Sequence, residues 1–123
     1  MKLTAVREGY AAIASAVVAD DVTVIDSLPD SITPPAVFVA WSDPWLTLDT
    51  YCGFVANVEI LVVAQRIEPG GQYGVIEGIV SDLAEALRLA HRSIRDITSP
   101  FPLQLGGVDY LSASINITHE VEE

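Results

Sequence analysis

Cysteine and histidine are the residues with which this chain could perform nucleophilic chemistry, and it holds very few of them. The 123 residues include one cysteine, Cys52, and two histidines, His91 and His119. A catalytic nucleophile needs a base and a group that orients the base, but neither histidine lies in a recognisable signature with the cysteine. We therefore interpret Cys52 as a small apolar residue, and we expect no catalytic residue and no enzymatic activity.

The carboxylates and glycines likewise have no spacing typical of a metal or cofactor site. Asp43 and Asp49 lie in one segment, but the pattern of a calcium-binding loop is absent around them. The stretch 71–74, Gly-Gln-Tyr-Gly, lacks the lysine of a phosphate-binding loop and the glycine spacing of a dinucleotide site. We expect solvated turns at both places, and therefore no metal and no cofactor.

The charge of the chain argues against several classes of partner. Six lysines and arginines oppose 17 acidic residues, which gives a net charge of −11. Nucleic acids and anionic membranes bind clustered positive charge, so we expect specific binding to neither. The longest apolar run, residues 36–41, is far shorter than the roughly 20 residues of a membrane helix. A lone cysteine and the absence of an apolar leader predict a protein made in a reducing cytoplasm.

Hydrophobic periodicity predicts the elements that would position any site. Two segments repeat their apolar residues at helical spacing, and four have the alternation or apolar runs of strands. The predicted order is helix 3–19, strands 22–25, 36–41 and 54–65, a helix from about 72 to 91 or beyond, and strand 107–119. The proline-rich stretch 99–102 is expected to stop the second helix.

This order, α-β-β-β-α-β, predicts an α+β fold in one domain, residues 1–123. Strands 36–41 and 54–65 are expected to form a large hairpin across the loop 42–53. Two amphipathic helices would cover one face of a mostly antiparallel four-stranded sheet. Only the acidic tail, at about 120–123, is expected to be loose.

Apolar residues in the predicted loop 42–53 are the first candidates for an interface. Trp45, Leu46 and Leu48 are hard to bury within so small a domain. Aromatic residues in loops are enriched at protein interfaces. We therefore consider Trp45 either a contact residue or a further core residue, and we name all three as candidates for an interface with another subunit or another protein.

Three arginines near the end of the second predicted helix are the other candidates. Arg88 and Arg92 are four residues apart on one helical face, and Arg95 follows about one turn later. Basic residues at a helix C-terminus are favoured by the helix dipole, which is one explanation. The alternative is a basic patch that meets an acidic patch on an identical neighbour, because a chain of charge −11 needs such complementarity to associate.

The order of features resembles the tail terminator proteins of long-tailed, siphovirus-type phages, especially those of actinobacterial hosts. The resemblance is one of pattern over nearly the whole chain, and its residues can be named. They are an alanine-rich N-terminal helix, Leu28-Pro29-Asp30, the Thr33-Pro34-Pro35 lead into an apolar strand, Tyr51-Cys52-Gly53 before a long strand, an amphipathic helix, and the final strand around Tyr110–Ile115.

The resemblance implies a structural virion protein. Six copies would form a ring at the head-proximal end of the tail, end the polymerisation of the tail tube and join the tail to the head connector. The implied partners are further copies of the chain, the major tail tube protein and head–tail connector proteins, with genomic DNA passing through unbound. Two alternatives remain open: another head–tail joining or minor tail protein of similar fold, and a cytosolic ligand-binding α+β module.

Overall fold

The computed structural model describes residues 3–25, 33–48, 53–67 and 73–121, which form two helices and six strands. The predicted loop residues 49–52, including Cys52, the segment Leu28-Pro29-Asp30 and the last two acidic residues lie outside the described residues. The elements are α1 (Leu3–Val17), β1 (Thr23–Ile25), β2 (Ala36–Leu48), β3 (Phe54–Arg66), α2 (Gly74–Leu89), β4 (Ser93–Ile97), β5 (Phe101–Leu105) and β6 (Val108–Val121).

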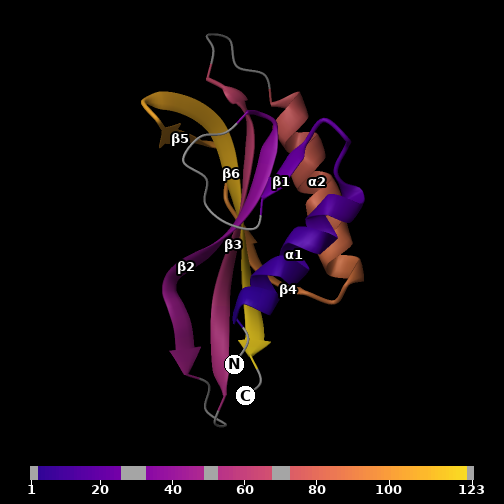
Figure 1. Cartoon of the computed structure of the whole chain (residues 1–123), viewed down its shortest axis with the longest axis vertical. Helices are drawn as coiled ribbons and strands as arrows, with labels where there is room; N and C mark the ends of the chain where they lie inside the picture. The colour runs from indigo at the N-terminus through magenta and orange to yellow at the C-terminus, as the bar shows by residue number, and fades with distance from the viewer. Residues whose placement is uncertain (1–2, 26–32, 49–52, 68–72, 122–123) are drawn as a thin grey trace.

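The strands form one sheet in the order β1-β2-β3-β6-β4, and β5 also pairs with β6 (Figure 1). The pairing of β1 with β2 is parallel, and the other pairings are antiparallel. The predicted α+β class, the mostly antiparallel sheet and the large β2–β3 hairpin are therefore confirmed. The predicted number of four strands is wrong, because β4 and β5 occupy a region that we expected to be helix end and loop.

Both helices pack on the same face of the sheet, as Figure 1 shows. Alternate residues of β3, among them Val58 and Ile60, point to this face and are buried. From α2, Leu83 and Leu87 lie against them with no exposed surface, and Tyr10 and Ala14 of α1 complete the layer. The even-numbered residues of β3, which the sequence marks as an unbroken apolar face, are thus the central part of the main core.

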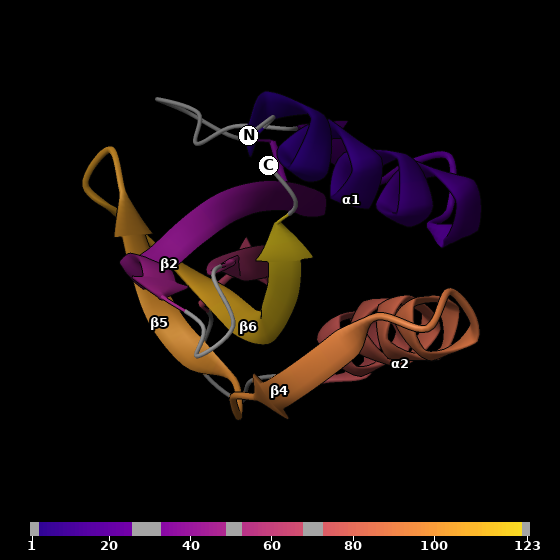
Figure 2. The same cartoon turned by 90° about the horizontal axis from the view of Figure 1, so that it is seen from below.

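The opposite face of the sheet also carries buried apolar side chains. At one end of this face, Phe38, Leu61, Val63 and Tyr110 form a second buried cluster. Partly buried apolar side chains pack against this cluster, three from β5 and one each from β1 and β6: Phe101, Leu103, Leu105, Ile25 and Val108. Figure 2 shows the cause, because the sheet curves and brings β5 around to the side away from the helices.

A two-residue turn explains why β5 exists. Leu105 pairs with Val108, and the two intervening residues, Gly106 and Gly107, have φ angles of 58° and 79°. Positive φ at both central residues is typical of the tight turn that matches the twist of a hairpin, and glycine adopts it without steric cost. The proline Pro102 is tolerated in β5 because that strand lies at the edge of the sheet.

The second helix ends before the last two candidate arginines. His91 has a φ of 57°, a left-handed conformation that usually requires glycine or asparagine. The backbone N–H of His91 donates to Arg88 O (3.1 Å), and that of Arg92 donates to Leu87 O (2.9 Å). These two bonds terminate the helix in a Schellman motif. This helix end could not be predicted from the sequence, because the left-handed position holds histidine and not glycine.

The strand β2 is also longer than predicted. Residues 42–48, which we expected to be loop, continue the pairing with β3 after a register shift between Trp41 and Leu46. At the other end of the chain, Glu120 and Val121 belong to β6 and pair with Val55 and Phe54. The expected loose tail is therefore ordered strand as far as Val121.

Replacing His91 by glycine tests the helix end. We expect His91→Gly to raise the free energy of unfolding by about 0.5–1 kcal/mol, because glycine adopts a left-handed conformation without the steric cost of a Cβ atom. The neighbouring Ala90 has an ordinary φ of −84°. Ala90→Gly should therefore lower stability by about 0.5–1 kcal/mol. Urea denaturation of both variants measures the difference, and a loss of stability in His91→Gly would contradict this explanation of the helix end.

Candidate functional site

At one end of the sheet, β2, β3 and β6 continue as a three-stranded ribbon beyond the strands that flank them (Figure 1). On one side β1 pairs only with Ala36–Phe38, and on the other β4 pairs with β6 only as far as Thr118. We call residues 46–48, 54–56 and 119–121 the ribbon end. The start of α1 and the end of β6 lie near it in Figure 1.

The register places an apolar row on the helix side of the ribbon end. Leu48 pairs with Phe54, which in turn pairs with Val121. In the next row, Leu46 pairs with Ala56, which pairs with His119. Residues directly opposite one another in antiparallel strands point to the same face. Leu48 is 71% exposed, whereas Val121, at the other end of the same row, is buried, so apolar surface remains uncovered on the β2 side of this end.

Trp45 extends this surface toward α1. Its ring centroid lies 5.5 Å from that of Trp41, and Trp45 is 48% exposed. The two tryptophans line a groove of about 640 Å³ together with Leu3 and Arg7 of α1. The fold therefore brings Trp45, Leu46 and Leu48 to one end of the molecule, although they lie on a strand and not on a loop.

The three candidate arginines do not form a patch on one helical face, because the helix ends at Leu89. Arg88 lies on α2, exposed, and its Nε atom donates to Glu85 Oε2 at 3.2 Å. Arg92 lies in the turn after the helix, and Arg95 lies on β4 with its Nε atom 3.4 Å from Asp96 Oδ2. Only Arg92 approaches the ribbon end.

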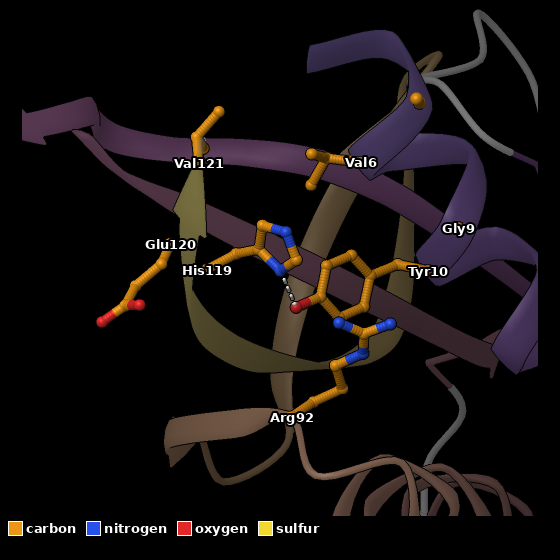
Figure 3. A pocket seen from close by; sticks show the side chains of 8 residues that line it. Val6, Gly9, Tyr10, Arg92, His119, Glu120 and Val121 are labelled. Carbon is orange, nitrogen blue, oxygen red and sulfur yellow. Dashed lines mark hydrogen bonds between the residues drawn. The ribbon is translucent and has the colours of Figure 1, made fainter. Parts of the chain in front are cut away.

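Arg92 belongs to a cluster with Tyr10 of α1 and His119 of β6 (Figure 3). The Tyr10 hydroxyl lies 2.9 Å from His119 Nδ1, and the two rings meet edge to face with centroids 5.5 Å apart. The guanidinium carbon of Arg92 lies 5.4 Å from the centroid of the Tyr10 ring. Such a position is attractive for a cation, because the face of an aromatic ring is electron-rich.

Burial and neighbouring charges shift the pKa values of His119 and Tyr10 in this cluster. Burial lowers the pKa of His119 below its ordinary 6.5, the charge of Arg92 lowers it further, and Glu120 opposes both effects. Burial raises the pKa of Tyr10, against the influence of Arg92. These shifts favour a protonated phenol and a neutral imidazole. The tautomer of His119 sets which group donates in the hydrogen bond between them: when Nδ1 accepts from the Tyr10 hydroxyl, the imidazole proton is on Nε2.

Two adjoining cavities, of about 490 and 430 Å³, open beside this cluster. Both are lined by Tyr10, Arg92, His119 and Glu120, and we call them together the Arg92 cleft. Sequence reasoning considered His119 only as a partner of Cys52 and placed Tyr10 within the predicted helix 3–19 without assigning it a role. Because Tyr10 and His119 are 109 residues apart, no local spacing could have joined them.

No protein-family profile and no curated protein sequence matches this chain. Among the described residues, no group of three or more His, Cys, Asp or Glu side chains could hold a metal ion. No helix in the described ranges is long and apolar enough to span a membrane. The ribbon end with its groove, and the Arg92 cleft, are therefore the features on which a function can be argued.

The low pKa of His119 predicts that stability depends on pH. Because the folded protein binds the proton less readily than the unfolded chain, protonation favours unfolding. The contribution is complete above the ordinary pKa of 6.5 and is lost as the pH falls through the folded value. We expect chemical denaturation to give a smaller pH dependence below 6.5 for His119→Gln than for the wild type.

His91→Gln is the matched control, because it removes a histidine and leaves the Tyr10 hydrogen bond in place. It should keep the pH dependence of the wild type. Equal slopes for His119→Gln and the wild type would show that the Tyr10–His119 contact does not control the titration.

Proposed function

We propose that this protein is a structural, ring-forming component of a phage virion, a tail terminator. In this proposal six copies close a ring at the head-proximal end of the tail tube and end its polymerisation. The ring contacts the major tail tube protein on one side and the head–tail connector on the other. The resemblance in the order of sequence features supplies the position in the virion, and the ribbon end supports the capacity for assembly.

The observation that carries the proposal is the uncovered apolar surface at the ribbon end. Trp45 and Leu48 are large, apolar and about half or more exposed, and Trp45 lines a groove beside α1. Exposed apolar surface next to a groove is typical of protein interaction sites. Tryptophan is also the residue type most enriched among those that dominate binding energies.

The free edge of β2 supports assembly independently. Beyond Phe38, no described strand pairs with β2 on the side away from β3. An unpaired edge is a template for another chain, and proteins that remain monomeric protect such edges. Here the edge continues for ten residues, interrupted by Pro44 and by the register shift. An adjacent subunit could cover both the edge and the apolar ribbon end.

The charge of the chain is compatible with a conduit for DNA. Six copies of a chain with charge −11 repel one another, so the contacts between them need apolar area or local charge pairing. Acidic side chains around a channel would repel the phosphates of passing DNA, and DNA would not adhere to the wall. The protein would then be made in the host cytoplasm and be located at the head-proximal end of the tail.

A ligand-binding module remains a second candidate, because the Arg92 cleft has the volume of a small-molecule site. A head–tail joining or minor tail protein of similar fold would use the same surface at another place in the virion. The native mass separates these classes. A ring has a mass of about six times 13.2 kDa, whereas a ligand-binding module is expected to be a small oligomer such as a dimer.

The double variant Trp45→Ala, Leu48→Ser tests the apolar ribbon end. Because both side chains are exposed, we expect the free energy of unfolding to change by less than about 0.5 kcal/mol per site. Assembly into the ring, measured by native mass spectrometry or on isolated tail tubes, should weaken by at least about tenfold.

Tyr73→Ala, Val75→Ser provides the control, since it removes two similarly exposed apolar side chains at the start of α2. It should assemble as the wild type does. A phage lacking the protein should make tails of uncontrolled length. Tails of normal length in that phage would exclude the terminator role and leave the joining role, and a dimer under all conditions would favour the ligand-binding module.

A further inference from the structure

Arg92 is a cation that no carboxylate of the described residues contacts as an ion pair. Among the described residues, the ion pairs of Arg88 and Arg95 satisfy those two arginines, but no carboxylate pairs with Arg92. Its Nε atom is buried and has no hydrogen-bond partner. The guanidinium is therefore held by the Tyr10 ring, and its hydrogen-bonding capacity is largely unused. Arg66 also has no ion pair among the described residues, but Arg66 is exposed, whereas Arg92 is partly buried.

The groups around Arg92 add further hydrogen-bond donors. The smaller cavity of the Arg92 cleft is lined also by His91, Ser93 and Thr118. His119 lines the cleft through its ring, whose Nδ1 atom is bonded to the Tyr10 hydroxyl and whose other nitrogen lies on the side toward Val6 (Figure 3). Glu120 is the acidic residue in the lining. Figure 3 shows its side chain directed away from Tyr10 and Arg92, as expected for the strand neighbour of His119.

We propose that the Arg92 cleft binds a carboxylate group, with the guanidinium of Arg92 as its principal partner. The planar fork of a guanidinium matches the two oxygens of a carboxylate. Two nearby features favour a single negative charge over the double charge of a phosphate monoester. They are Glu120 in the lining and the C-terminus of α2, whose dipole is negative at that end.

The carboxylate could come from two sources. One is a small free carboxylate, for which the two cavities have sufficient volume. The other is an acidic side chain of a second copy of this chain, and this source rests on the proposed ring. The cleft adjoins the ribbon end at His119 and Val121, so a neighbouring subunit that covers the apolar surface would also reach Arg92.

Glutarate is the probe for a free carboxylate. We would titrate it into the ¹⁵N-labelled wild type at pH 7 and low ionic strength, and follow the amide and imidazole signals by NMR. We expect saturable shifts at Arg92, Ser93 and His119. Arg92→Gln should weaken binding by at least about tenfold, because it removes a charged hydrogen-bond donor. Arg88→Gln removes the same charge from an exposed position and should bind as the wild type does.

The native masses of the same three proteins test the second source. If a neighbouring subunit supplies the carboxylate, Arg92→Gln should lose the assembly that the wild type and Arg88→Gln retain. Loss of either glutarate binding or assembly in Arg92→Gln alone supports the site and identifies the source.

The proposal is overturned if glutarate causes no saturable shift at the cleft and Arg92→Gln also has the oligomeric state of the wild type. Shifts in the wild type that centre on Arg88 and Glu85 instead of the cleft would overturn it as well, without requiring any variant to fold. Glutarate binding by a protein that never forms a ring would leave the carboxylate site standing and reject the proposed function, so the two failures are distinguishable.

Discussion

The register of β3 between β2 and β6 is the constraint on which the rest of the structure depends. Side chains alternate along a strand, so a slip of one residue would move the whole apolar face of β3 to the opposite side of the sheet. The same register aligns Leu48, Phe54 and Val121 in one row, and Leu46, Ala56 and His119 in the next. Both helices pack on the apolar face that this register creates. The same register sets where the candidate residues of β2 and β6 lie relative to the helices.

The packing of α1 on this surface joins the two candidate features. Tyr10 reaches His119 near the end of β6, while Leu3 and Arg7 at the start of the same helix form one wall of the tryptophan groove. Arg92 enters from the other side, because the Schellman motif at His91 turns the chain out of α2 toward Tyr10. An apolar surface and a cation that forms no ion pair with any described residue therefore lie at the same end of a strongly acidic molecule.

This combination suits a subunit that must associate against its own net charge. Apolar contact at Trp45 and Leu48 would supply affinity, while a carboxylate at Arg92 would supply orientation, since charged pairs contribute more to specificity than to raw affinity. His119 belongs both to the Arg92 cleft and to the ribbon end, where it shares a row with Leu46 and Ala56. Its Nδ1 atom and the Tyr10 hydroxyl form the hydrogen bond that joins β6 to α1.

The sequence alone determined the α+β class, both helices, the long hairpin of β2 and β3 and the final strand, because each has a periodicity that local residues carry. It also gave Trp45, Leu46 and Leu48 as candidate interface residues, because large apolar residues in a segment between two predicted strands can be recognised from the sequence. It did not indicate that β2 continues through Pro44, that β4 and β5 follow α2, or that Tyr10, Arg92 and His119 meet. Pairing with β3 extends β2, and pairing with β6 forms β5. The left-handed conformation of His91 ends α2 at a place where the sequence has no glycine. The cleft depends on residues more than 80 positions apart in the chain, and only the packing of α1 and the turn after α2 against β6 brings them together.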